Sequence, residues 1–193
     1  MREPNFKHIR CAWAGGNALM MDYHDREWGV PLRDDLQLFE FMILEGAQAG
    51  LSWQTVLNKR EEYRRAFHSF NPKRMAQYGA LDAARLMANP GIIRNRLKIS
   101  AAISNAQAYL RVLDEGGSFS DYLWWFVGGK PIQHGFTSHK QLPATSPESE
   151  AMSKDLKQRG FRFVGSTICY AFMQATGMVN DHTTDCFRHR ELS

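Results

Sequence analysis

The sequence has few cysteines, no long apolar run and no low-complexity segment. Its 193 residues include three cysteines, an odd number that argues against a disulfide framework and favours metal binding or burial. No apolar stretch approaches the roughly 18 residues of a membrane-spanning helix, and residues 1–5 lack the apolar stretch of a signal peptide. We therefore expect a cytoplasmic protein that does not bind membranes.

Aromatic residues and a mild excess of positive charge are what the sequence has instead. Aromatic side chains make up 12% of the residues and the apolar fraction is 44%, which is enough for a sizeable hydrophobic core. The formal net charge is +4. Such a charge is compatible with a nucleic-acid partner, but many basic proteins bind no nucleic acid.

Helix signals dominate the sequence, so it predicts an all-α fold. Asp34 or Asp35 can cap a helix whose apolar run covers residues 36–44. The capping, proline and glycine signals predict further helices at 52–68, from Pro72, at 83–87, from 92 to about 113, at 119–127, from Thr145 to Gly160 and at 166–176. Residues 11–31 show no clean period. Residues 128–142 are the one place where a strand or short hairpin is expected.

Two Cys/His pairs stand near opposite ends of the sequence. Cys11 and His24 have twelve residues between them, and His182 and Cys186 have three. Two thiolates and two imidazoles form the closed tetrahedral set of a structural zinc site, and one ion would tie the two irregular ends of the chain together. Alternatively, His24 belongs to a hydrogen-bonded surface and Cys186 is incidental, because the spacing matches no common zinc finger.

The other cysteine and histidines carry no metal pattern. Cys169 lies among apolar residues and is expected to be a buried thiol in a helix. The histidines without a partner pattern are His8, His68, His134, His139 and His189.

A turn at residues 89–91 joins two of the expected helices. Backbone amides after such a turn would lie at a helix N-terminus, which favours anions, and Arg94, Arg96 and Lys98 follow closely. This pattern is typical of a phosphate site that positions DNA without reading its sequence. An ordinary helix–turn–helix with a solvated basic face explains the same residues equally well.

An acid, two glycines, a leucine and a tryptophan gather in residues 44–53. Glu45 follows the apolar run, and Leu51 and Trp53 follow the glycines. The combination predicts a base-binding pocket with a carboxylate, an apolar wedge and a stacking ring. Two alternatives remain open: Glu45 could instead cap the helix that begins at Ser52, and Leu51 could be an ordinary core residue.

Five motifs follow one another along the chain. They are residues 23–31 (YHDREWGVP), 44–53 (LEGAQAGLSW), 91–96 (GIIRNR), 159–170 (with RGF, VG and TICY) and 179–182 (VNDH). In this order they resemble the DNA-3-methyladenine glycosylase I family of the helix-hairpin-helix DNA glycosylase superfamily. The resemblance runs from about Cys11 to Cys186, which is nearly the whole chain.

The resemblance implies a helix-hairpin-helix glycosylase fold in which one zinc ion ties the N- and C-terminal segments. We expect a single catalytic unit, residues 1–193, with a hairpin-containing lobe at about 34–142 and a zinc-pinned lobe at about 11–33 plus 143–190. The implied activity is that of a monomeric, monofunctional glycosylase that flips and excises 3-methyladenine from double-stranded alkylated DNA and releases the free base. The implied zinc ligands are Cys11, His24, His182 and Cys186.

The resemblance also implies roles for individual residues. Glu45 contacts the base, and Trp13, Tyr23 and Trp53 line the pocket. The residues expected to contact DNA are Leu51, Gly91, Ile93, Arg94, Arg96 and Lys98. The chain departs from the family at Met20, where some members carry a second tyrosine, so that a softer thioether replaces a stacking ring.

The expected chemistry needs little acid–base catalysis. An N3-alkylated adenine is cationic and already a good leaving group, so electrostatic stabilisation of the departing base and the sugar cation suffices, with water as nucleophile. No lysine stands in residues 44–53 for Schiff-base chemistry, and residues 128–130 (GGK) lack the catalytic aspartate usual in the superfamily. The rival functions are a non-catalytic DNA-binding module and a zinc hydrolase or deaminase. The deaminase motif is missing and the four-ligand set is closed, which both disfavour the second rival.

Overall fold

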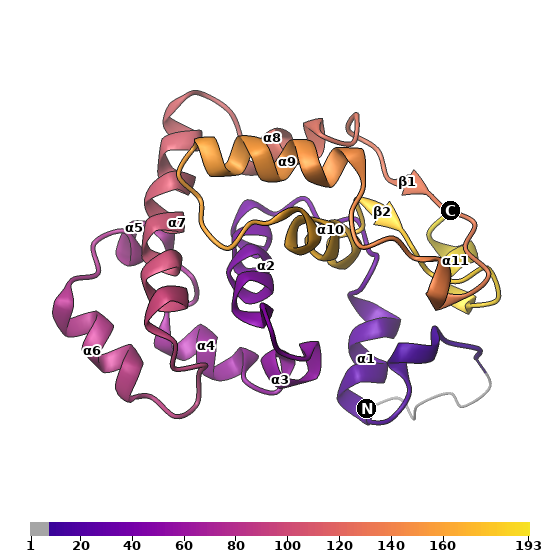
Figure 1. Cartoon of the computed structure of the whole chain (residues 1–193), viewed down its shortest axis with the longest axis horizontal. Coiled ribbons are helices and arrows are strands. Elements are labelled where there is room, and N and C mark those ends of the chain that lie inside the picture. Colours follow the sequence, from indigo (N-terminus) through magenta and orange to yellow (C-terminus); the bar gives the residue numbers. More distant parts are fainter. Residues whose placement is uncertain (1–7) are drawn as a thin grey trace.

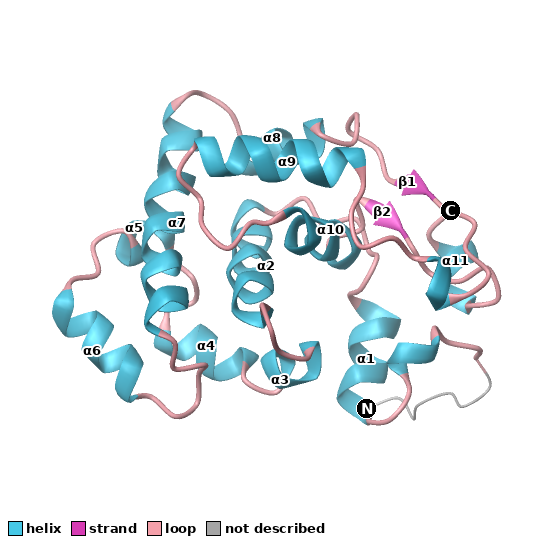
Figure 2. Ribbon diagram, in the orientation of Figure 1, coloured by secondary structure: helices cyan, strands magenta, loops and turns pink. Residues whose placement is uncertain are grey.

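The computed structural model describes residues 8–193, and its regular secondary structure is almost all helix, as the sequence predicts (Figures 1 and 2). Within these residues, every helix is too short or too polar to cross a lipid bilayer. The α-helices are α1 (Ala18–Arg26), α2 (Asp35–Gln48), α3 (Trp53–Leu57), α4 (Arg60–Ala66), α5 (Pro72–Met75), α6 (Ala80–Ala88), α7 (Arg96–Asp114), α8 (Phe119–Trp125), α9 (Pro147–Gln158), α10 (Ser166–Ala175) and α11 (Phe187–Glu191). The shorter elements are 3-10 turns η1 (Ala12–Ala14) and η2 (His139–Gln141) and strands β1 (Ile132–Gln133) and β2 (Val179–Asn180).

Helix α2 lies at the centre of the molecule and packs against α3, α7, α8 and α10 (Figure 1). Residues 38–47 are all buried, which is expected of a helix that is apolar on every side. Asp34 caps it, since its Oδ1 accepts a hydrogen bond from the Gln37 amide at 2.9 Å. The helix continues to Gln48, beyond the apolar run, so Glu45 lies in its last turn rather than after its end.

Several helix predictions were wrong in their boundaries, and the helix expected from residue 92 begins only at Arg96 (α7). Residues 52–68 form two helices, α3 and α4, because the Lys59 amide bonds the Val56 carbonyl three residues back and a new helix axis begins there. Helix α6 begins before Asp82, which is its third residue, and α9 is capped by Ser146 rather than Thr145.

The segment without a clean period contains a helix that the sequence did not reveal. Helix α1 is capped by Asn17, whose Oδ1 accepts from the Met20 amide at 2.8 Å. Tyr23 and His24 are neighbours in the sequence, and both are buried because they face different parts of the structure. The helix therefore lacks the single apolar stripe by which a sequence reveals a helix. Helix α11 was also missed. The expected strand in residues 128–142 exists as β1, but it pairs in parallel with β2 near the C-terminus instead of forming a hairpin.

Gly177 ends α10 and lets the segment before α2 pass very close to it. Its φ is +70°, and a Cβ there would lie 2.4 Å from the carbonyl carbon of Val30. The Leu32 amide donates to the Thr176 carbonyl at 3.0 Å and holds the two segments together. A side chain at this position would therefore push apart the helix that ends here and the segment that enters α2.

Gly177→Ala is expected to lower the free energy of unfolding by at least about 2 kcal/mol, because it adds a backbone clash to a left-handed conformation. Gly128→Ala is the matched control, since Gly128 has a φ of +66° but open space around it. The control should cost only the backbone term of about 1 kcal/mol. Urea denaturation measures both, and equal losses in the two variants would contradict the packing role of Gly177.

Candidate active site and metal centre

A pocket of about 250 Å³ opens where the C-terminal turn of α2 meets α1, α3 and α10. The structure brings together here the four side chains that the sequence assigned to one pocket, although they come from separate parts of the chain. The lining residues are Trp13, Met20, Tyr23, Trp28, Glu45, Gln48, Trp53, His139, Leu142, Ala171 and Gln174.

Glu45 places an unpaired carboxyl group in the wall of this pocket. The residue is 4% exposed, and within the described residues its Oε2 has no hydrogen-bond partner. Burial raises the pKa of Glu45 to about 8, so the carboxyl group keeps its proton at neutral pH. A bound cation would favour the ionised form instead. The alternative role as a helix cap is wrong, because Ser52 itself caps α3 with its Oγ, 3.3 Å from the Thr55 amide.

Aromatic rings surround this carboxyl group. The Tyr23 and Trp53 ring centroids lie 5.4 Å apart at 42°, and Trp13 lies 6.4 Å from Tyr23. Phe41 supports Trp53 from behind, with the two rings nearly parallel and 6.4 Å apart. Burial, followed by the nearby Glu45, raises the pKa of Tyr23 well above its usual value, so the phenol stays neutral.

Trp53 carries the second unpaired polar group of the pocket. Its Nε1 is buried and has no partner among residues 8–193. Buried polar groups are normally hydrogen-bonded, and leaving one without a partner is costly. An unpaired indole N–H and an unpaired carboxyl group in one pocket therefore indicate a polar ligand.

Several lining residues were missed by the sequence interpretation. Gln48 follows Glu45 by three residues on α2 and therefore shares its face, which is a signal that the sequence does contain. Ala171 and Gln174 are related in the same way on α10, but nothing in the sequence places α10 beside α2. His139 and Leu142 reach the pocket from a loop, for which no periodic signal exists.

Cys11, His24, His182 and Cys186 form a buried cluster that can hold a metal ion. Their ligand atoms all lie within 4.8 Å of one another. Cys186 Sγ is 3.4 Å from His24 Nε2, and Cys11 Sγ is 3.5 Å from His182 Nδ1. Such separations match the edges of a tetrahedron around an ion bound at about 2.0–2.3 Å. The alternative of a surface His24 and an incidental Cys186 is therefore wrong.

Hydrogen bonds outside the cluster fix the direction of both imidazole rings. His24 Nδ1 lies 2.9 Å from Asp25 Oδ1, which leaves Nε2 toward the cluster centre. His182 Nε2 lies 3.1 Å from the Trp28 carbonyl oxygen, which leaves Nδ1 toward it. Partners of this kind orient metal-binding histidines in proteins generally, so the donor set and its surroundings fit a metal ion.

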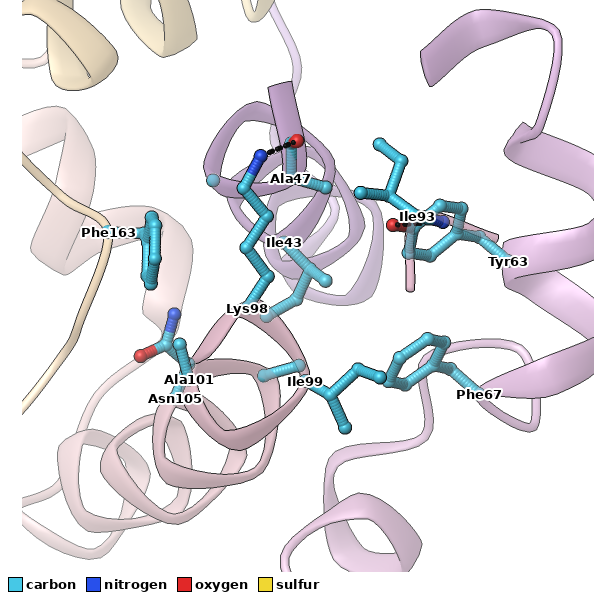
Figure 3. Close-up of a pocket in the computed structure, with 12 residues that line it drawn as sticks. Ile43, Ala47, Tyr63, Phe67, Ile93, Lys98, Ile99, Ala101, Asn105 and Phe163 are labelled. Carbon is cyan, nitrogen blue, oxygen red and sulfur yellow. Dashed lines mark hydrogen bonds between the residues drawn. The ribbon is translucent and has the colours of Figure 1, made fainter. Parts of the chain in front are cut away.

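The turn between α6 and α7 uses most of its backbone amides internally. A Cβ on Gly91 would lie 2.1 Å from the Cγ of Glu62, so any other residue here would displace the Glu62 side chain. The Gly91 amide donates to Asn89 Oδ1 at 2.8 Å, and the Ile93 amide donates to the Tyr63 hydroxyl at 3.3 Å (Figure 3). Helix α7 begins at Arg96, and the side chain of Asn95 caps its amides at residues 97–98.

The three cations of this turn occupy different environments. Arg94 and Arg96 are exposed, whereas Lys98 reaches the last turn of α2. Its Nζ donates to the carbonyl oxygen of Ala47 at 2.7 Å (Figure 3) and to that of Ala49 at 2.6 Å. The void beside Lys98 in that view measures only about 20 Å³, so this is a packing seam rather than a ligand pocket. Lys98 thus uses two of its three donors to join the hairpin to the helix of Glu45.

Leu51 projects from the surface next to the site. It is 42% exposed, follows Gly50 at a φ of +77°, and borders a hollow that Glu45 also lines. The alternative that Leu51 is a core residue is therefore wrong.

Three of the remaining histidines, for which the sequence shows no partner pattern, make polar contacts in the fold. His134 Nδ1 lies 2.6 Å from Asp181 Oδ1, His189 Nε2 lies 2.8 Å from the His134 carbonyl oxygen, and His68 contacts the Tyr78 hydroxyl. These polar contacts join residues that are distant in the sequence. Cys169, in contrast, is a buried thiol in α10 as predicted.

The chain resembles known proteins over almost its full length. It matches the family model described as methyladenine glycosylase over residues 13–189. It is 51% identical over 177 residues to the DNA-3-methyladenine glycosylase of Haemophilus influenzae. This match covers 92% of this chain and 96% of the relative. It is also 51% identical over 177 residues to DNA-3-methyladenine glycosylase 1 of Escherichia coli, with 92% and 95% covered.

Solved structures agree with the sequence matches. A crystal structure of 3-methyladenine DNA glycosylase I superposes with a TM-score of 0.91 at 54% identity, covering 93% of this chain and 98% of the other. A structure of 3-methyladenine DNA glycosylase I from Staphylococcus aureus, which shows the structural basis of 3-methyladenine recognition, gives a TM-score of 0.89 at 39% identity, with 92% and 95% covered. The resemblance seen in the sequence is confirmed, and the chain belongs to the methyladenine glycosylase family.

Proposed function

We propose that this protein is a monofunctional DNA glycosylase that hydrolyses the N-glycosidic bond of 3-methyladenine in double-stranded alkylated DNA. The observation that carries the proposal is the unpaired carboxyl group of Glu45, buried among aromatic rings in a pocket of about 250 Å³. A cationic, flat, hydrogen-bonding ligand satisfies all of these features. The names of the relatives point to the same base.

The base must leave the helical stack before its bond can be cut. Extrusion costs a few kcal/mol and less for a damaged base. Leu51 is the proposed wedge that fills the gap in the stack, because it is exposed beside the pocket. Stacking on Trp53, Tyr23 or Trp13 returns roughly 1–3 kcal/mol per base, and the positive charge of the base adds a cation–π attraction.

Glu45 supplies the charge that the alkylated base needs. As the cation enters, the carboxyl group loses its proton to solvent, and the carboxylate then accepts a hydrogen bond from the adenine edge. The electron pair of the breaking bond moves to the base and neutralises it, while the sugar becomes a cation. Water attacks this cation, and the extra proton of the water molecule passes to solvent. The carboxylate stabilises this positive charge in a site with little water. No lysine lines the pocket within residues 8–193, which fits hydrolysis without a Schiff base.

The turn between α6 and α7 is the proposed contact with the DNA backbone. Arg94 and Arg96 are exposed cations that can bind phosphate. Gly91 and Ile93 lie in the same turn and are proposed to contact DNA with it. Lys98 has one donor left after its two bonds to α2, so its larger contribution is to hold the hairpin against the pocket helix.

We propose that the metal in the buried cluster is a single structural zinc ion. Two thiolates and two imidazoles suit zinc, and four protein ligands leave no position for a reactive water molecule. When bound, the ion supplies a cross-link between the two ends of the chain. Cys11, His24, His182 and Cys186 would hold it, while Asp25 and the Trp28 carbonyl keep the two rings in place.

We further propose that the chain divides into a hairpin-containing lobe (34–142) and a metal-pinned lobe (11–33 plus 143–190). The pocket takes residues from both lobes. The protein acts as a monomer. It works in the cytoplasm, where a reducing environment suits its free thiols.

Glu45→Gln is expected to lower the release of 3-methyladenine from methylated duplex DNA by at least about 100-fold, because the charge on the cationic base loses its counterpart. The measurement is free base released under single-turnover conditions, identified by mass spectrometry. Glu150→Gln, which removes an exposed acid on α9, is the control and should retain full activity. Release at the wild-type rate by Glu45→Gln would exclude this role of Glu45, and no release by the wild-type protein would exclude the proposed function.

The raised pKa of Glu45 predicts a pH-dependent cost to stability. The group ionises near 4.5 in the unfolded chain and near 8 in the folded one, so the folded state holds the extra proton and stability falls as pH rises through that window. Glu45→Gln removes this cost and should stabilise the protein by on the order of 3 kcal/mol at pH 7, with no gain at pH 4. Denaturation curves at the two pH values check it, and a gain of equal size at both would contradict the burial argument.

Metal analysis is expected to find one zinc ion per chain, and its removal should lower the melting temperature because the ends of the chain come apart. Cys186→Ser should lose the ion. Cys169→Ala is the matched control, since this buried thiol lies outside the cluster, and it should keep the ion. Chelation that abolished activity and left the melting temperature unchanged would instead favour a metal-dependent hydrolase.

A further inference from the structure

Asp181 is a buried carboxyl group that the mechanism above does not use. It is 1% exposed and lies next to the proposed metal ligand His182 in the chain. Its Oδ2 accepts hydrogen bonds from the Tyr170 hydroxyl and from Gln174 Nε2, both at 2.7 Å. His134 Nδ1 lies 2.6 Å from its other oxygen. The carboxyl group is thus surrounded on both oxygens.

The bond from Gln174 fixes the direction of an amide group that lines the base pocket. The amide nitrogen of Gln174 is the donor in this hydrogen bond, so it faces Asp181. The amide oxygen therefore faces away from Asp181. Within residues 8–193 this oxygen has no hydrogen-bond partner, while the residue itself lines the pocket. The hydrogen bond to Asp181 thereby fixes the orientation of this acceptor before any ligand binds.

Gln48, the other amide of the pocket, is not held in this way. Its side chain makes no hydrogen bond to any residue of the described chain, although it lines the same cavity. A free amide can rotate and present either its oxygen or its nitrogen to a ligand. Of the two glutamines, only Gln174 can discriminate between a donor and an acceptor on a bound base.

We propose that Gln174 is a specificity residue that accepts a hydrogen bond from the exocyclic amine of 3-methyladenine, and that Asp181 is the positioning residue that prevents its amide from turning. This inference rests on the proposed function. Its consequence is that the pocket rejects 3-methylguanine, a base with the same alkylation and the same positive charge in DNA.

The chemistry of the two purines supports this discrimination. Adenine carries an amine donor at position 6, where guanine carries an oxygen acceptor. A guanine in the pocket would set its oxygen against the Gln174 oxygen. Rotation of the amide would relieve that clash but would aim the same oxygen at Asp181 Oδ2, which is itself an acceptor. A buried acceptor facing another acceptor is costly in either orientation, and such repulsion is a common source of specificity.

Gln174→Met tests the acceptor directly, because methionine keeps the length of the side chain and removes both polar atoms. Methylated duplex DNA that contains both lesions is incubated with each variant, and the two released bases are quantified. The ratio of 3-methyladenine to 3-methylguanine release is expected to fall about tenfold in Gln174→Met, through slower release of 3-methyladenine. Tryptophan quenching by each free base gives a second readout that does not depend on activity, and the affinity ratio should fall likewise.

Asp181→Asn tests the positioning residue. Asparagine can accept or donate, so the Gln174 amide is released to turn, and 3-methylguanine release should rise while 3-methyladenine release stays within severalfold of wild type. Metal content and melting temperature are measured in parallel because His182 is adjacent. If this variant does not fold, Gln174→Met decides the question alone.

Gln48→Met is the matched control, since it removes the unheld amide from the same pocket, and its ratio of released bases should equal that of wild type. A wild-type ratio in Gln174→Met, or an equal loss of both bases, would overturn the inference and leave the proposed function standing. A wild-type protein that releases no 3-methyladenine would overturn the proposed function itself.

Discussion

Four side chains from opposite ends of the chain meet in one buried cluster, and both walls of the pocket depend on that meeting. His24 follows Tyr23 on α1, so the cluster holds the helix that carries one ring of the pocket. His182 follows Asp181, whose carboxyl group holds Gln174 on the other wall. The cluster lies outside the pocket, yet in the proposed function it determines where a ring and an amide stand relative to the base.

The pocket keeps polar groups unpaired that most protein interiors would pair. The Glu45 carboxyl and the Trp53 indole N–H are buried without partners among the described residues, at a cost to stability that the surrounding core of α2 offsets. A site that is unsatisfied when empty gains more when the right ligand arrives. In the proposed function the same property would make neutral, undamaged bases poor ligands, since they cannot stabilise the ionised form of Glu45.

The sequence predicted those features that depend on local chemistry. The Asp34 cap and the grouping of Glu45 with Trp53 followed from residue types and spacing. The spacing only suggested the Cys/His set, and the place of Trp13 and Tyr23 in the pocket came from the family resemblance. What it could not predict depends on tertiary contacts. Strand β2 has no periodic signal in two residues, and α1 buries polar and aromatic side chains together. Gln174 becomes part of the pocket only because α10 packs against α2.

Lys98 has a consequence for the geometry of DNA binding. Its two bonds to the carbonyls of Ala47 and Ala49 join the hairpin to the helix that carries Glu45, so the spacing between the proposed phosphate contacts and the pocket mouth is set by a short, stiff connection. In the proposed reaction the enzyme therefore keeps the phosphate contacts and the pocket at a fixed distance from each other. The duplex must adapt to it, and DNA that is already weakened by a lesion adapts at the lowest cost.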